Sequence, residues 1–199
     1  MIVKFCGLRR EEDIRAVNAT GPDLVGFILV KGRRRYIEPE VIRSLRVGLD
    51  KDIKVVGVFI DEDINVVKSL IEDKTIDIAQ LHGSESNEYI KELKASTGAT
   101  IIKAIGIRSP EDIKRAEESC ADLIIVDSPG GGTGSPFDWE LLKKIKREYI
   151  LAGGINVDNL PEAMLKLNPY GFDISSGIET DGLKDEEKMK AVMAIIKKG

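Results

Sequence analysis

Two residues capable of acid–base chemistry stand at the ends of apolar segments. Cys6 ends the run "IVKFC", and Asp127 ends the run "LIIVD". A thiolate whose pKa is lowered can act as a base or nucleophile, and a carboxyl group whose pKa is raised by its surroundings can act as a general acid. Each residue also has a simpler interpretation, because a free cysteine is often a small buried hydrophobe and an aspartate often caps a helix or turn. The second cysteine, Cys120, precedes an apolar run and is expected only to pack.

Polar side chains follow other apolar runs. Gln80 and His82 belong to "QLHG", and Arg35 belongs to the basic segment "KGRRRY". A guanidinium at such a position can hold a carboxylate through two parallel hydrogen bonds, although most basic runs are solvated surface. His82 fits either a structural role or contact with a ligand. The glycine-rich segment "GGGTG" after Asp127 is either a surface loop or a loop that folds over a ligand.

Small residues end two consecutive apolar runs near the C-terminus. Gly153 and Gly154 lie in "AGGI", and Ser175 and Ser176 lie in "DISSG". Neither strands nor helices favour glycine in their interior, but small residues let backbone N–H groups approach an anion closely. Two ordinary glycine turns are the alternative. We expect the two segments to form one phosphate site.

The elements that must position these residues repeat along the chain. Eight apolar, β-branched runs start 22 to 30 residues apart and are expected to be strands: 2–6, 24–29, 54–60, 76–81, 100–105, 123–127, 149–153 and 171–175. Segments with helical periodicity follow them: 11–19, 38–49, 62–73, 86–96, 109–119, 138–148, 157–167 and 185–198. Eight such units predict an α/β fold, a compact single (β/α)₈ TIM barrel over residues 1–199. A doubly wound open sheet has the same rhythm and is the alternative.

In a barrel of this kind the chemistry lies at the C-terminal ends of the strands, where all the residues above are expected. Phosphate sites recur in the loops after strands seven and eight. We therefore expect a barrel that binds a small phosphorylated molecule, with Cys6 and Asp127 facing each other across its mouth.

Composition narrows the classes of function. The 199 residues carry a net charge of −4, which argues against general binding to nucleic acid. Apolar runs are too short to cross a membrane, and the first residues do not read as a signal peptide. Two cysteines make no disulfide framework, so a cytoplasmic location is expected. With a single histidine, a metal site built on several imidazoles is excluded.

Six motifs together resemble the phosphoribosylanthranilate isomerase family of tryptophan biosynthesis. They are "KFCG", "RRYI", "QLHG", "VDSPGGGTGSPFDW", "LAGGI" and "DISSGIE", which follow the order found in that family between Lys4 and Glu179. The departures are Phe5, where isoleucine is usual, and an additional Arg33 before the matched pair.

The resemblance implies an Amadori rearrangement of N-(5-phosphoribosyl)anthranilate to 1-(2-carboxyphenylamino)-1-deoxyribulose 5-phosphate, with no cofactor or metal. It implies that Asp127 is the general acid, that Cys6 is the general base and that Arg35 holds the anthranilate carboxylate. Gln80 and His82 are expected to line the substrate site. The phosphate is expected near Gly153, Gly154, Ser175 and Ser176.

Other functions remain open from the residues. An isomerase of the histidine-pathway aminoaldose resembles this chain but uses an aspartate where Cys6 stands. A metal-dependent pentose-phosphate epimerase is disfavoured by the single histidine. A barrel that only binds a phosphorylated ligand would need neither an acid nor a base. We expect a monomer or homodimer.

Overall fold

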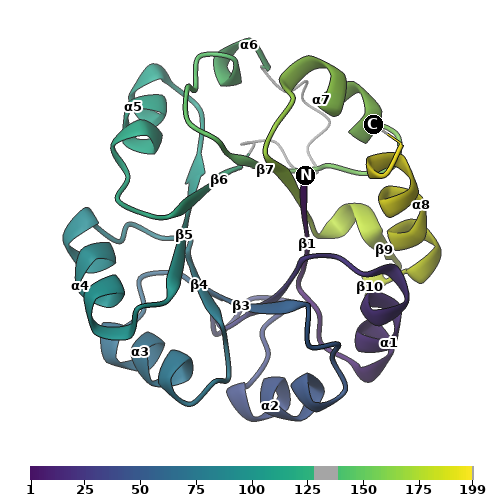
Figure 1. Cartoon of the computed structure of the whole chain (residues 1–199), viewed down its shortest axis with the longest axis horizontal. Coiled ribbons are helices and arrows are strands. Elements are labelled where there is room, and N and C mark those ends of the chain that lie inside the picture. Colours follow the sequence, from purple (N-terminus) through teal and green to yellow (C-terminus); the bar gives the residue numbers. More distant parts are fainter. Residues whose placement is uncertain (128–138, 199) are drawn as a thin grey trace.

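Eight parallel strands close into a barrel in a computed structural model of the chain, which describes residues 1–127 and 139–198 (Figure 1). Neighbours in the chain pair with each other, and β8 pairs with β1. The strands are β1 (Ile2–Cys6), β2 (Leu24–Ile28), β3 (Lys54–Phe59), β4 (Ile78–Leu81), β5 (Thr100–Gly106), β6 (Leu123–Asp127), β7 (Ile150–Ala152) and β8 (Gly171–Ile174). The predicted TIM barrel is therefore confirmed, and the open-sheet alternative is wrong because β8 pairs with β1 and closes the sheet into a ring.

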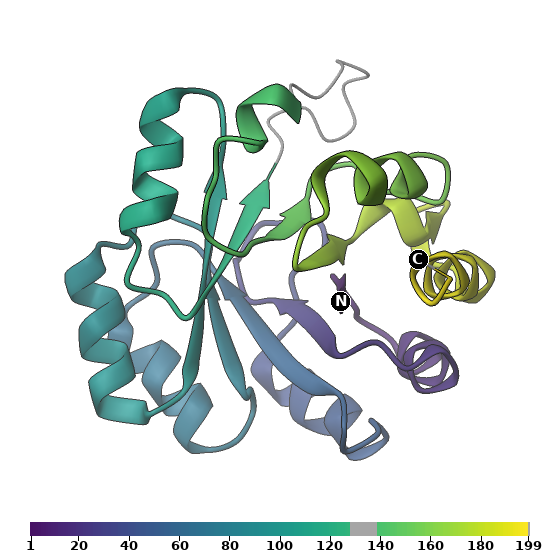
Figure 2. The ribbon, with the colours of Figure 1, turned by 45° about the horizontal axis from the view of Figure 1, so that its top comes forward.

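Helices surround the barrel on its outside (Figures 1 and 2). Several begin where the sequence supplies a cap: Ser109 and Asp112 form a capping box before α5, and the Asp63 carboxylate accepts the first-turn N–H of α3. In Figure 2 the first and last helices lie side by side, so the outer ring of helices closes around the barrel of strands. The helices are α1 (Glu11–Thr20), α2 (Pro39–Val47), α3 (Ile64–Glu72), α4 (Asn87–Thr97), α5 (Pro110–Glu118), α6 (Trp139–Leu142), α7 (Leu160–Leu167) and α8 (Glu186–Ile196). None of the described helices is long and apolar enough to cross a membrane.

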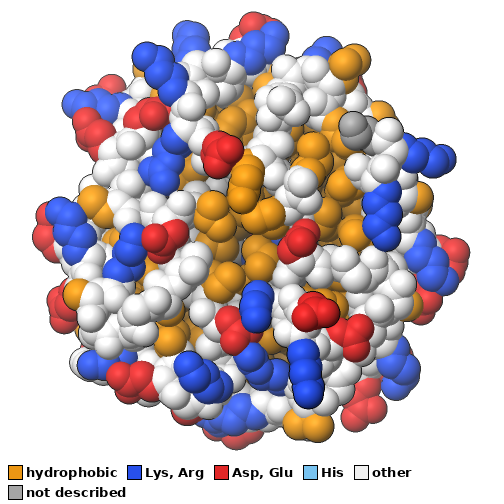
Figure 3. Space-filling view, viewed as in Figure 1, with side chains coloured by type: hydrophobic (Ala, Val, Ile, Leu, Met, Phe, Trp, Pro, Cys, Tyr) orange, Lys and Arg blue, Asp and Glu red, His pale blue; other side chains and the backbone are white. Residues whose placement is uncertain are grey.

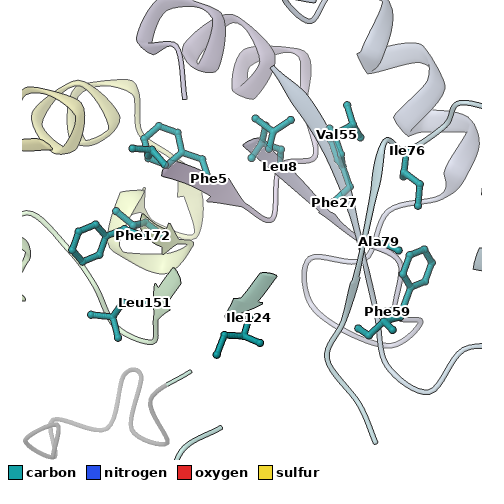
Figure 4. Close-up of a cluster of buried hydrophobic side chains, with 14 of the residues drawn as sticks. Phe5, Leu8, Phe27, Val55, Phe59, Ile76, Ala79, Ile124, Leu151 and Phe172 are labelled. Carbon is teal, nitrogen blue, oxygen red and sulfur yellow. The ribbon is translucent and has the colours of Figure 1, made fainter. Parts of the chain in front are cut away.

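Successive side chains of a strand point to opposite faces of the sheet, so the apolar residues form two separate clusters. The larger cluster lies between the strands and the helices, where Phe5, Phe27, Phe59 and Phe172 are almost fully buried (Figure 4). The smaller cluster fills the barrel and includes Leu24, Val56, Ile78, Ile102, Ile125 and Ile150. Figure 3 shows apolar side chains gathered in the middle of the ring and charged side chains around its rim. The ends of the strands are therefore held by packing on both faces, which makes them a rigid frame for a site.

Two segments differ from the sequence-based expectation. The helix expected over 138–148 is confined, in the described residues, to α6. The chain after α6 is instead tied to the end of α5, because Arg147 donates to the carbonyl oxygens of Ala116, Ser119 and Ala121. After β8 there is a 3₁₀ turn, η1 (Ser176–Ile178), and a short hairpin of β9 (Glu179–Thr180) and β10 (Leu183–Lys184), which the periodicity did not indicate.

Candidate active site

Cys6 lies at the C-terminal end of β1 and is buried. Its side chain points into the barrel over Gly26 of β2: a Cβ atom added at Gly26 would lie 2.7 Å from the Cys6 sulfur and 3.0 Å from Lys4 Nζ. Only glycine leaves room for both groups, so the sequence of β2 makes space for the thiol. The strand-end position expected for Cys6 is the one observed.

The pKa of Cys6 is raised, whereas a thiolate that acts as a base near neutral pH needs a lowered pKa. Burial raises it, because a desolvated thiolate is disfavoured, and the nearby Lys4 ammonium acts in the opposite direction. Lys4 is itself fully buried and pairs with Asp173 of β8, with 3.0 Å between Nζ and each carboxylate oxygen. Sequence analysis identified neither residue as functional, because each lies within an apolar run and only the register between β1 and β8 brings the two together.

Asp127 ends β6 and sits beside His82, which follows β4. His82 Nε2 lies 3.5 Å from Asp127 Oδ2, and both side chains are about one-third exposed, at 37% and 35%. The structure thus brings together two residues that the sequence placed in separate motifs. The segment "SPGGGTG", suggested as a loop over a ligand, lies outside the described residues.

Gln80 of β4 is a buried polar residue whose side-chain hydrogen bonds are incomplete among the described residues. It occupies a strand position that faces the barrel interior, where it is paired with Val58 of β3 and Ile102 of β5. Its Oε1 atom is buried and has no hydrogen-bond partner among the described residues. An unpaired buried amide costs about 1–3 kcal/mol, so this oxygen is suited to a ligand group that donates a hydrogen bond.

Arg35 is already engaged by a carboxylate. Its Nε and Nη2 atoms donate to the two oxygens of Glu179, at 2.7 and 2.8 Å. Lys184 donates to the same carboxylate at 2.9 Å. Burial by itself would raise the pKa of Glu179, but the hydrogen bonds from Arg35 and Lys184 outweigh it and lower the pKa to about 2. Glu179 therefore stays ionised and orients the guanidinium.

The stem of Arg35 passes directly over Gly7. A Cβ atom added to Gly7 would lie 2.5 Å from Arg35 Cδ, and the φ of Gly7 is 84°. Glu179 and Lys184 were not assigned roles from the sequence. The signal that could have found Glu179 is an acidic residue directly after the "SSGI" turn.

The two glycine- and serine-rich segments lie next to each other after β7 and β8, which are paired strands. A Cβ atom added to Gly177 would overlap the carbonyl oxygen of Ile155, so the two loops touch. Gly153 and Gly154 have φ values of 90° and 68°, which side chains rarely adopt.

The backbone of these loops is suited to an anion. No described residue accepts a hydrogen bond from the N–H groups of Gly153, Gly154 or Ser176, whereas the Ser175 hydroxyl donates to the Cys6 carbonyl at 2.9 Å. Unpaired N–H groups on small residues in adjacent loops are the arrangement that binds phosphate. Ser175 also connects this loop to the strand that carries the thiol.

Comparison with known proteins identifies the family of the chain. A sequence model of N-(5'-phosphoribosyl)anthranilate (PRA) isomerases matches residues 3–194. The N-(5'-phosphoribosyl)anthranilate isomerase of Clostridium acetobutylicum is 42% identical over 204 residues, covering 98% of each chain.

Solved structures agree with the sequence matches. The phosphoribosyl anthranilate isomerase of Thermus thermophilus superimposes with a TM-score of 0.87 at 36% identity, over 100% of this chain and 99% of the other. A phosphoribosyl anthranilate isomerase in complex with reduced 1-(o-carboxyphenylamino)-1-deoxyribulose 5-phosphate gives a TM-score of 0.86 at 30% identity, over 100% of both chains.

Proposed function

The chain belongs to the N-(5'-phosphoribosyl)anthranilate isomerase family, and we propose that it performs the family's reaction with Cys6 as general base and Asp127 as general acid. The chain is an isomerase of tryptophan biosynthesis. The substrate proposed here is N-(5'-phosphoribosyl)anthranilate, and the whole chain acts as one catalytic barrel.

The proposed reaction moves protons and leaves the oxidation level of the whole molecule unchanged. Asp127 gives a proton to the furanose ring oxygen, and the ring opens to a Schiff base. Cys6 removes the proton from C2', and the resulting enolamine tautomerises to the ketone. Each positioned acid or base typically contributes about 10²–10⁴-fold to the rate.

The observation that carries this proposal is the placement of Cys6 and Asp127. They end β1 and β6 at the same rim of the barrel, on the register positions that face its interior. A barrel that only binds a ligand has no use for an acid and a base at one mouth. Turnover of N-(5'-phosphoribosyl)anthranilate, followed by loss of its fluorescence, tests the proposal. Binding without turnover, or turnover of the histidine-pathway aminoaldose alone, would contradict it.

Three further residues have proposed roles in binding the substrate. Arg35 holds the anthranilate carboxylate, with its guanidinium oriented by Glu179. Gln80 and His82 line the space between Cys6 and Asp127, where the unpaired Gln80 amide oxygen and the 3.5 Å approach of His82 to Asp127 support contact with the substrate. The protein is proposed to act in the cytoplasm as a monomer or homodimer.

Replacing Arg35 by methionine is expected to raise the KM for the substrate about 10- to 150-fold. This range corresponds to the loss of a charge-assisted hydrogen bond, which contributes about 1.5–3 kcal/mol. Steady-state kinetics measures the KM of this variant and of a matched control, Arg33→Met. Arg33 is a suitable control because it is exposed and makes no ion pair with a described residue. Equal KM values for the two variants would show that the run at 33–35 is only a basic surface.

Gly153, Gly154 and Ser176 are proposed to bind the substrate phosphate through their N–H groups, with Ser175 holding their loop against β1. Replacing Gly154 by valine is expected to weaken binding of phosphorylated ligands at least tenfold, because valine disfavours a φ of 68° and crowds the anion. Calorimetric titration with inorganic phosphate and with anthranilate measures the two ends of the site separately. An equal loss of affinity for the two ligands would contradict the phosphate assignment.

A further inference from the structure

A buried ion pair lies directly beneath Cys6 in the barrel. Lys4 and Asp173 occupy paired register positions on β1 and β8, and the Lys4 side chain has no exposed surface. Around them the barrel interior is filled by apolar residues. A buried ion pair is often no more stabilising than well-packed apolar residues of similar volume, so stability alone gives little reason for its presence.

The ammonium end of this pair also meets the thiol. Lys4 Nζ lies 3.0 Å, and the Cys6 sulfur 2.7 Å, from the point where a Gly26 Cβ would stand, so the ammonium and the thiol lie close together over Gly26. Lys4 therefore pairs with Asp173 and also lies near Cys6. The three groups form one buried cluster contributed by two adjacent strands.

We propose that Lys4 is a positioning residue, whose ammonium stabilises the thiolate form of Cys6 and is itself held in place by Asp173. The proposal rests on the proposed function only in taking Cys6 as the base. It also explains the "K-x-C" spacing, because residues two apart in a strand point to the same face. Lys4 and Cys6 thus share the barrel interior, whereas Phe5 between them packs outward against the helices.

The charges around the thiol agree with this role. Burial raises the pKa of Cys6, and the Lys4 charge lowers it. The Asp173 charge raises the pKa by less than Lys4 lowers it, and Lys184 from β10 also lowers it. For Lys4, burial alone would lower the pKa, but Asp173 and Cys6 outweigh burial and raise it, so Lys4 stays charged. Arg35 faces Cys6 from the loop after β2, where it is engaged by Glu179.

The test is a direct titration of the Cys6 thiol by its thiolate ultraviolet absorbance, in a Cys120→Ser background that leaves Cys6 as the one thiol. Replacing Lys4 by methionine is expected to raise the thiol pKa by about 1–3 units, since an opposite charge at this range is lost. Asp173→Asn is expected to lower the thiol pKa, because the asparagine oxygen can still accept a hydrogen bond from Lys4 while the negative charge near the thiol is lost. Substitutions of the two partners of one ion pair then shift the pKa of the thiol in opposite directions, which loss of structure would not produce.

Two further variants keep the experiment decisive. In Lys4→Met/Asp173→Asn no buried charge lacks a partner, so this variant answers the question if Lys4→Met alone fails to fold. Its thiol pKa is expected above that of the parent, because Lys4 has the larger effect. Lys103→Met is the matched control: Lys103 is also buried and paired with a carboxylate, Glu85, at 2.7 Å, but it is not among the charges that act on Cys6, so the thiol pKa should not move.

Enzyme kinetics supplies a second readout. In Lys4→Met the rise of kcat/KM with pH should move to higher pH, so that activity lost at neutral pH is partly recovered at alkaline pH. An unchanged thiol pKa in Lys4→Met, or shifts of the same sign in Lys4→Met and Asp173→Asn, would overturn the proposal. The expected thiol shifts combined with full activity of Cys6→Ser would instead overturn the assignment of Cys6 as the base.

Discussion

Replacing Cys6 by serine is expected to lower kcat about 10²–10⁴-fold and to leave KM nearly unchanged. A hydroxyl has the size of the thiol but is a far weaker base near neutral pH, so the step lost is removal of the C2' proton. Because serine fits the space over Gly26, the fold should be retained. Single-turnover fluorescence measurements with enzyme in excess would separate this chemical step from binding.

Cys120 provides the control for this substitution. It is partly buried against the outer core and lies before β6, at the end of the barrel away from Cys6. Cys120→Ser should keep full kcat and change only the free energy of unfolding, measured by urea denaturation. Near-parental turnover by Cys6→Ser would remove the thiol from the mechanism.

Much of the fold could be predicted because the local signals agree with one another. Runs such as "LIIV" before Asp127 are apolar throughout, as strands covered on both faces must be, and caps such as Ser109 mark where helices begin. The segment after α6 was mispredicted because Arg147 holds it against α5, a long-range contact that periodicity does not contain. The hairpin after β8 was missed because its strands are only two residues long.

The positions of Cys6, Asp127 and the glycine loops at strand ends could be predicted, because apolar runs mark where strands end, while the roles of these residues stay predictions. Contacts that depend on strand register could not be predicted. Lys4 reads as one polar residue in an apolar run, and only its pairing with Asp173 across the β1–β8 seam explains its burial. In the same way, Arg35 was expected to hold the anthranilate carboxylate, and the sequence did not indicate its pairing with Glu179, 144 residues later. The raised pKa of Cys6 likewise depends on burial that the motif "KFCG" does not report.

Replacing Asp127 by asparagine should lower kcat about 10²–10⁴-fold, because an amide of the same shape cannot give up a proton to the ring oxygen. Asparagine has nearly the same shape as aspartate and keeps the place beside His82, which lies 3.5 Å from the carboxylate, so substrate binding should be largely retained. Steady-state kinetics that separate kcat from KM test this assignment, because loss of the general acid should lower kcat and leave KM nearly unchanged.

Asp122 supplies the matched control, since it stands just before β6 while Asp127 ends it. Its carboxylate accepts the Ile101 N–H at 2.8 Å and pairs with Lys94 at 2.6 Å. Burial would raise the pKa of Asp122, but these two partners lower it, so its ionised form contributes stability that is lost as pH falls through the lowered pKa. Asp122→Asn should therefore lower the Tm at neutral pH and leave kcat unchanged, whereas Asp127→Asn should lower kcat with little change in Tm. If both variants lost stability and neither lost turnover, Asp127 would be a structural residue like Asp122, and the proton for ring opening would have to come from another group at the barrel mouth.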